Sequence, residues 1–261
     1  MIACSSDTSA QLLYYEGFDY SSGSLSTQNG GTGFDNAWGT VGAGGSVNVQ
    51  ADSLLYGDLE TSGGKAYLQP TATGGATITR NLDTNYNSGT VYVSFLTNLD
   101  AGTRYFGLAL DSSGSEMFLT GKPTTFGSTG DWSLSNSTYL PGSPVSSGEA
   151  ITLDTTALLV VRIDFNSSGT NERIRLYVNP TLETEPVSAD IDLVTRSSIS
   201  MNQIRLTAGY QIAGSPSSQG WVDEIRIGTD FASVTPVPEP GTFALFGLGL
   251  AAMIVLRRRI S

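Results

Sequence analysis

The chain has 261 residues, which is enough for one large domain, and its composition excludes several classes of function. It contains no histidine, so neither a Ser-His-Asp nor a Cys-His catalytic site can exist, and its single cysteine cannot form an internal disulfide. Removing the three consecutive arginines near the C-terminus from the 13 basic residues leaves 10 against 24 acidic ones, a net charge of −14. Phosphate backbones repel such a surface, so we expect no nucleic-acid binding.

The first residues, MIACSSDTSAQ, contain neither the basic segment nor the apolar run that opens the signal peptide of an exported protein. They do place the small residues Thr8 and Ala10 at the −3 and −1 positions of a cleavage site. The start MIAC also resembles the end of a lipoprotein signal, with Cys4 as the acylated residue. We therefore expect residues 1–11 to be the last part of a longer signal peptide. The alternative is a disordered N-terminus with an incidental cysteine.

Residues 12–233 contain many short runs of alternating apolar and polar residues, separated by turns rich in Gly, Ser, Asn and Asp. Such runs are typical of antiparallel strands that are buried on one face. They include residues 90–97, 104–111, 116–120, 158–165, 173–179 and 203–210. No Pro-rich linker, fixed repeat or long helical pattern interrupts them. The sequence therefore predicts one all-β domain, a two-sheet antiparallel jelly-roll sandwich.

Two parts of this region carry more specific expectations. The runs at 158–165 and 173–179 flank the turn NSSGTNE, so we expect them to pair as a hairpin. Residues 121–148 show the weakest strand pattern. There we expect long loops at the edge of the sandwich, with one short strand around Trp132.

Two motifs carry a resemblance to a known fold family. YYEGFDY (residues 14–20) and QGWVDEIRIGTDF (residues 219–231) together resemble the first and last strands of the concanavalin A-like, laminin-G-like jelly rolls of bacterial surface proteins. The resemblance spans roughly residues 12–232. It implies two curved antiparallel sheets in which the first and last strands pair, and it suggests a role connected with glycans.

Asp223 is a candidate ligand in the second motif. Trp221, Asp223, Ile225 and Ile227 share one parity, so a regular strand would place the carboxylate among apolar neighbours. Such a carboxylate needs an arginine, backbone N–H groups or a cation as partner. One interpretation is a calcium ligand, and the other is a β-bulge that turns Asp223 outward or an arginine pair that fixes the sheet. Calcium needs several oxygens, and no nearby spacing supplies them, so we favour the structural interpretation and expect no cofactor.

The sequence argues against an enzyme. Glycoside hydrolysis needs two carboxylates across the scissile bond, and the Glu-x-Asp-x-x-Glu strand of glucanases with the concanavalin A-like fold is missing. The close acids in residues 57–62 and 181–185 lie in turn-like sequence and predict solvated loops. Aromatic rings that stack on sugars remain as candidates, although each also fits a role in the core or in anchoring a loop. They are Trp38, Trp132, Tyr139 and Trp221.

The C-terminal segment differs from everything before it. Three prolines make residues 234–241 an extended spacer, and residues 242–256 are uncharged and almost wholly apolar. As a helix the apolar run would span roughly 22 Å, which flanking residues and snorkelling arginines can extend toward the ~30 Å of a bilayer core. The positive-inside rule places residues 257–261 in the cytoplasm, through Arg257, Arg258 and Arg259, and the body outside. The alternative, a buried core helix with a basic end, leaves the order of these parts unexplained.

That order resembles the PEP-CTERM sorting signal of Gram-negative bacteria, with Pro238, Glu239 and Pro240 as the motif. The resemblance implies recognition by an exosortase, cleavage near the motif, and transfer of the body from the inner membrane to the cell surface or extracellular matrix. Proteins with this signal are associated with exopolysaccharide and biofilm matrix. Our leading hypothesis is therefore a non-enzymatic surface or matrix protein that associates with polysaccharide. The alternative is a divergent polysaccharide-active enzyme of the concanavalin A-like fold.

Overall fold

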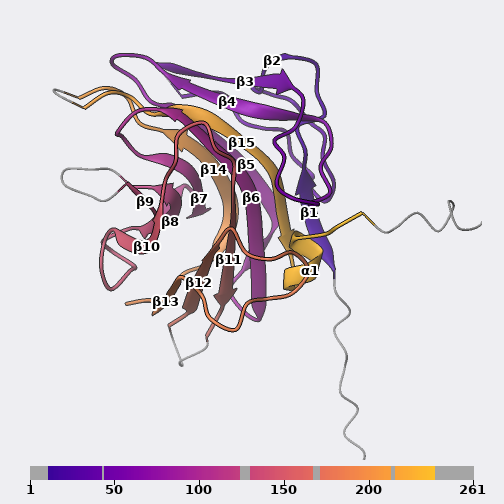
Figure 1. Ribbon diagram of the computed structural model, residues 1–261, viewed down its shortest axis with the longest axis vertical. Coiled ribbons are helices and arrows are strands. Elements are labelled where there is room, and N and C mark those ends of the chain that lie inside the picture. The colour runs from indigo at the N-terminus through magenta and orange to yellow at the C-terminus, as the bar shows by residue number, and fades with distance from the viewer. Residues whose placement is uncertain (1–10, 43, 124–129, 167–170, 213–214, 239–261) are drawn as a thin grey trace, which may run out of the picture.

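The computed structural model describes residues 11–42, 44–123, 130–166, 171–212 and 215–238, which form two antiparallel sheets (Figure 1). The all-β class is therefore confirmed. The larger sheet has the order β13 (Ile191–Val194), β12 (Arg173–Val178), β11 (Ala157–Asp164), β6 (Thr90–Ala101), β15 (Gln219–Gly228), β4 (Gly64–Pro70), β3 (Gly45–Ala51) and β2 (Gly23–Ser24), with β1 (Leu12–Glu16) also paired to β15. The smaller sheet has the order β10 (Val145–Ala150), β9 (Asp131–Ser135), β8 (Ser115–Lys122), β7 (Phe106–Ser112), β14 (Met201–Ala208) and β5 (Ala76–Tyr86).

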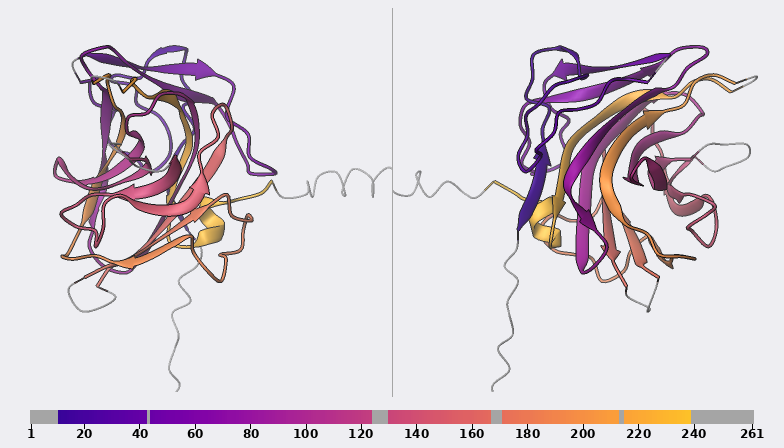
Figure 2. Two further views of the ribbon diagram at one scale, coloured as in Figure 1. Left: turned by 60° about the vertical axis from the view of Figure 1, so that its left-hand side comes forward. Right: turned by 180° about the vertical axis from the view of Figure 1, so that it is seen from behind.

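Apolar side chains between the two sheets form the main core. From the larger sheet, Val91, Val93 and Phe95 of β6 are buried there, as their alternation predicts. From the smaller sheet, Ile204 and Leu206 of β14 face them in the same cluster. The longer strands curve strongly around this core (Figure 2), so the two sheets enclose it between them.

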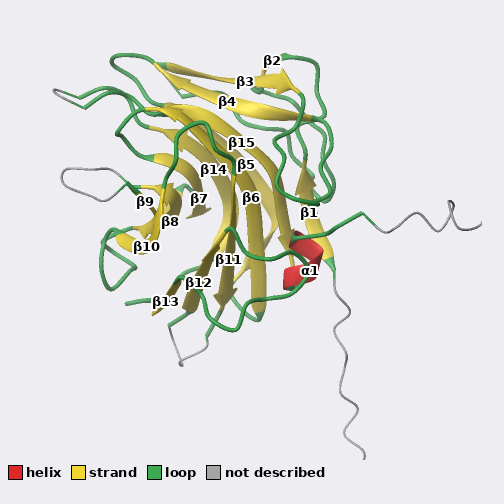
Figure 3. Ribbon diagram, in the orientation of Figure 1, coloured by secondary structure: helices red, strands yellow, loops and turns green. Residues whose placement is uncertain are grey.

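A second apolar cluster lies on the outer face of the larger sheet. Tyr92 and Leu96 of β6, together with Leu158 and Val160 of β11, are buried under the short helix α1 (Phe231–Val234) and nearby loops (Figure 3). The expectation of one buried face is therefore wrong for β6 and β11. Burial on both faces explains why these two strands are apolar almost without interruption.

The expected strand pairings are present. β11 pairs with β12 from Leu159 opposite Val178 to Asp164 opposite Arg173, so the hairpin is confirmed. The first and last long strands also pair, with Glu16 of β1 opposite Ile225 of β15. The short strand expected around Trp132 is β9, but β10, which begins at Val145, was not expected.

The two ends of the described chain meet beside α1. The backbone N–H of Gln11 donates to the side-chain oxygen of Thr229, just before the helix. The predicted membrane helix at 242–256, the cluster Arg257–259 and Cys4 all lie outside the described residues. Within the described ranges, no helix has the length and apolar character needed to cross a membrane.

Candidate functional site

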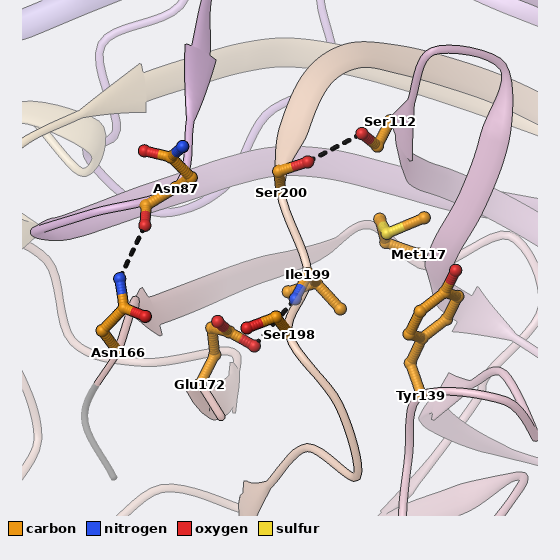
Figure 4. A pocket seen from close by; sticks show the side chains of 9 residues that line it. All are labelled: Asn87, Ser112, Met117, Tyr139, Asn166, Glu172, Ser198, Ile199 and Ser200. Carbon is orange, nitrogen blue, oxygen red and sulfur yellow. Dashed lines mark hydrogen bonds between the residues drawn. The ribbon is translucent and has the colours of Figure 1, made fainter. Parts of the chain in front are cut away.

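An open, polar pocket of about 440 Å³ lies at the end of the sandwich where β5, β7 and β11 finish and β12 and β14 begin (Figure 4). We refer to it as the end pocket. Loops and strand ends from across the sequence supply its walls. The lining residues are Asn87, Ser112, Met117, Tyr139, Asn166, Glu172, Ser198, Ile199 and Ser200.

Hydrogen bonds hold the walls of the end pocket in place. Glu172 is only 1% exposed, and its Oε2 accepts from the backbone N–H of Ile199 at 2.9 Å and from the hydroxyl of Thr195 at 3.1 Å. This carboxylate therefore fixes the loop that leads into β14. On the other side, the hydroxyls of Ser112 and Ser200 lie 2.7 Å apart (Figure 4). The pocket is largely formed before any ligand enters, which lowers the cost of binding.

Asn166 supplies another wall. Its side-chain amide donates to the backbone carbonyl of Asn87 at 2.8 Å, and its backbone has a φ of 57°. Asparagine tolerates this left-handed conformation better than most residues do. The turn after β11 therefore needs an asparagine-like residue at this position, and the same residue ties the ends of β5 and β11 together.

The lining favours binding of a neutral, hydroxyl-rich molecule. Amides and hydroxyls dominate, and the ring of Tyr139 adds one aromatic surface (Figure 4). Among the described lining residues, Glu172 is the one carboxylate, so they do not supply the pair of acids that glycoside hydrolysis requires. These amides and hydroxyls can exchange hydrogen bonds with the hydroxyl groups of a ligand.

The four aromatic candidates do not converge on one site. Tyr139 lines the end pocket, whereas Trp38 and Trp132 are 1% and 2% exposed and lie in the main core. Trp221 lies on the outer face of the larger sheet, and its ring centroid is 4.9 Å from that of Tyr67. Burial of Trp38 and Trp132 favours their alternative role as core residues.

The sequence reasoning missed the rest of the pocket. Asn166 and Glu172 stand at the two ends of the turn NSSGTNE, which was used only to predict the hairpin. Polar residues at both ends of a hairpin turn are one signal that could have identified them. Asn87, Ser112 and Ser200 come from separate loops, so no local pattern connects them.

Asp223 lies at a β-bulge where β15 changes its neighbour. The first half of β15 pairs with β4 up to Val222, and the second half pairs with β1 from Ile225 onward. The register against β6 shifts in between, and Glu224 has a φ of 52°. The bulge reverses the expected parity, because Ile225 joins Val222 in the main core while Trp221 packs on the outer face.

The carboxylate of Asp223 is fully buried and is not turned toward solvent, contrary to one of the expectations. Its two oxygens accept from the backbone N–H groups of Leu54 at 2.8 Å and Glu224 at 2.7 Å. Burial, and next to it the charge of the neighbouring Glu224, raise the pKa of this carboxyl to about 8, although the two N–H donors oppose the shift. The buried carboxyl group thus takes two backbone N–H groups as its hydrogen-bond partners.

Glu224 takes the arginine partner instead. Its carboxylate pairs with Arg226 at 2.6 Å and accepts from the backbone N–H of Ser62 at 2.7 Å and from the hydroxyl of Tyr15 at 3.0 Å. Burial raises the pKa of Glu224, and Arg226 opposes that shift. Among the residues the structure describes, no three Asp, Glu, Cys or His side chains are grouped as a metal site would require, and the expectation of no cofactor at Asp223 stays a prediction.

Comparison with known proteins identifies the C-terminal segment. Residues 236–259 match the PEP-CTERM protein-sorting motif, as the resemblance predicted. No curated protein sequence matches the chain. The sorting motif implies an exported protein that an exosortase recognises.

Several solved structures resemble the fold. The globular domain of T. cruzi calreticulin is 13% identical with a TM-score of 0.48, and the match covers 95% of this chain and 100% of that one. An alginate lyase bound to an alginate trisaccharide is 14% identical with a TM-score of 0.47, over 82% of this chain and 97% of that one. An endo-1,3-β-glucanase from Streptomyces sioyaensis is 13% identical with a TM-score of 0.44, over 87% and 99%. These values are too low to assign any activity to this chain.

Proposed function

We propose that the protein is a non-enzymatic component of the cell surface or extracellular matrix that binds polysaccharide in its end pocket. The sorting motif supports the location, because it implies export and recognition by an exosortase. In this proposal residues 242–256 first hold the chain in the inner membrane, with the body on the periplasmic side. Cleavage near the motif then transfers the body to the surface or matrix.

The lining of the end pocket is the observation that carries the binding function. Sugar hydroxyls can exchange hydrogen bonds with the amides of Asn87 and Asn166 and with the serine hydroxyls. The ring of Tyr139 offers an apolar surface for the C–H face of a sugar. The volume of about 440 Å³ is in the usual range for small-molecule sites.

Replacing Tyr139 by alanine is expected to weaken polysaccharide binding roughly tenfold, the factor that corresponds to about 1.4 kcal/mol. The physical reason is the loss of the one aromatic surface in the lining. Glycan-array screening followed by calorimetry on the best ligand measures this effect. Tyr210→Ala is the matched control, because Tyr210 is also half-buried but follows the far end of β14. Equal losses in both variants would contradict a binding role for the end pocket.

An enzyme acting on polysaccharide is the second candidate, and the burial of Glu172 inside the pocket is what favours it. A carboxyl group in such a place can serve as a general acid or base. Release of reducing sugar by the wild-type protein, abolished in Glu172→Gln, would establish this function. Glutamine keeps an oxygen that can accept from Ile199, so the loop before β14 should stay in place. Binding without turnover supports the non-enzymatic proposal.

Replacing Glu239 by alanine, or both Pro238 and Pro240, is expected to leave the full-length chain in the inner membrane. These residues form the motif that the sorting enzyme reads, and the apolar run behind them is unchanged. Immunoblotting of membrane and secreted fractions in a host with an exosortase measures the outcome. Processing and release at the wild-type level would contradict this role of the motif.

A further inference from the structure

The segment that leads into the sorting motif is attached to the body up to Pro236. Val234 and Thr235 are fully buried, and Val234 packs against the outer face of the larger sheet. Three hydrogen bonds anchor this segment. The hydroxyl of Ser94 donates to the backbone carbonyl of Val234 at 2.6 Å. The backbone N–H of Glu183 donates to the hydroxyl oxygen of Thr235 at 2.9 Å, and that of Glu60 donates to the backbone carbonyl of Pro236 at 2.9 Å. The chain therefore leaves the body at Pro236 and not through a long linker.

The motif begins almost at once after this anchor. Val237 alone separates Pro236 from Pro238, the first motif residue, which is exposed. An extended chain advances at most about 3.6 Å per residue, so Pro238 lies within ~7 Å of Pro236 and Pro240 within ~14 Å. The distance to Pro238 is well below, and the distance to Pro240 about equal to, the radius of gyration of a small folded domain, about 13 Å for 100 residues. An enzyme that encloses the motif must therefore touch the body around the exit point.

The surface at this exit point combines apolar and acidic side chains. Leu12 and Leu55 are 39% and 73% exposed, and Leu12 shares a cavity of about 320 Å³ with Pro236. Exposed acids lie in the two loops that hold the tail. We define the tail-exit face as Leu12, Leu55, Asp58, Glu60 and Glu183.

We propose that the tail-exit face is a docking surface for the exosortase, on a part of the enzyme that presents apolar and basic side chains. This inference rests on the proposed sorting function and extends it from the motif to the folded body. An anionic lipid surface would be repelled by Asp58, Glu60 and Glu183, so the enzyme fits the charge of this face better than the bilayer does. The apolar contacts come from Leu12, which lines the cavity, and from Leu55, which is exposed in the loop that also carries Glu60.

Leu55→Asp tests the proposal in the full-length chain, expressed in a host with its exosortase. The rate of conversion to the processed form, measured by pulse-chase labelling, should fall roughly tenfold, since a charge replaces an apolar contact. Leu153→Asp is the matched control and should be processed at the wild-type rate. Leu153 is also exposed, at 50%, but its neighbour Asp154 bonds to Leu99, at the end of β6 away from α1. A wild-type rate for Leu55→Asp would overturn the proposal.

A longer connection between body and motif provides the second test. Inserting Gly-Ser-Gly-Ser between Val237 and Pro238 separates the motif from the tail-exit face, so Leu55→Asp should no longer change the rate in that background. A slow rate that persists in the lengthened chain would mean that the substitution acts through folding, and would overturn the proposal. The two backgrounds together therefore separate docking from stability.

Photo-crosslinking identifies the partner. A benzophenone amino acid at position 55 should crosslink to the exosortase, whereas the same group at position 153 should not. Crosslinks from position 55 to lipid alone would overturn the proposal in favour of a bilayer contact. If the wild-type chain is not processed at all, the sorting function itself fails and the docking proposal fails with it. Normal wild-type processing with no effect of Leu55→Asp removes only the docking proposal.

Discussion

Replacing Arg80 by methionine is expected to lower the free energy of unfolding by about 3–5 kcal/mol. The side chains of Arg80 and Glu16 form an ion pair, and both are 0% exposed. Methionine fills much of the same volume but leaves the carboxylate of Glu16 buried without its cation. Urea denaturation followed by tryptophan fluorescence measures the loss.

The large effect follows from what the pair connects. Glu16 lies on β1 of the larger sheet and Arg80 on β5 of the smaller one, so the ion pair bridges the two layers of the sandwich. Glu16 also accepts from the indole N–H of Trp38 at 2.9 Å. Arg80 donates to the backbone carbonyls of Asn36 at 2.9 Å and Gly30 at 2.7 Å. The loop between β2 and β3 therefore depends on this pair as well.

An exposed ion pair provides the control. Arg173 and Asp192 are paired on the surface with side chains 44% and 38% exposed, and Arg173→Met should lower the free energy of unfolding far less than Arg80→Met does, because solvent screens the exposed pair. The double variant Glu16→Gln with Arg80→Met should recover part of the loss, because it no longer buries an unpaired charge. A loss for Arg80→Met no greater than for Arg173→Met would contradict the structural role assigned to the buried pair.

Local sequence patterns were sufficient for the parts of the fold that depend on neighbouring residues. The β11–β12 hairpin follows from two alternating runs around one polar turn, and its register agrees with that pattern from Leu159 to Asp164. The pairing of β1 with β15 was predicted too, but only through the resemblance to a fold family. No local pattern specifies a contact between the two ends of a chain.

Features that depend on distant contacts could not be predicted. The bulge at Asp223 arises because β15 exchanges β4 for β1 as its neighbour, and the sequence of β15 alone does not contain that information. The same holds for burial of both faces of β6, which requires α1 and loops from elsewhere in the chain. The end pocket joins Asn87 with Ser200 and Glu172 in the same way. Only Tyr139 was identified there beforehand, by its residue type.

Raising the pH from about 5 to 8 is expected to destabilise the protein through Asp223. Burial raises the pKa of this carboxyl from 3.8 to about 8. Between these values the folded protein holds a proton that the unfolded chain has released, so stability falls as the pH rises. The stability that this one carboxyl contributes is fully present below about pH 4 and is lost toward pH 8. In between, the free energy of unfolding falls by up to about 1.4 kcal/mol per pH unit.

Urea denaturation of wild type and Asp223→Asn at several pH values between 5 and 8 tests this expectation. Asparagine cannot ionise, so the variant should show a flatter dependence of the unfolding free energy on pH than wild type. Asp58→Asn, which removes an exposed carboxyl from the neighbouring loop, should keep the wild-type slope. Glu224 has a pKa that burial also raises, so some slope should remain in Asp223→Asn and disappear when Glu224→Gln is added. A wild-type slope in Asp223→Asn would contradict this expectation. It would mean that the Asp223 carboxyl is ionised throughout this pH range, with its two N–H donors outweighing the cost of burial.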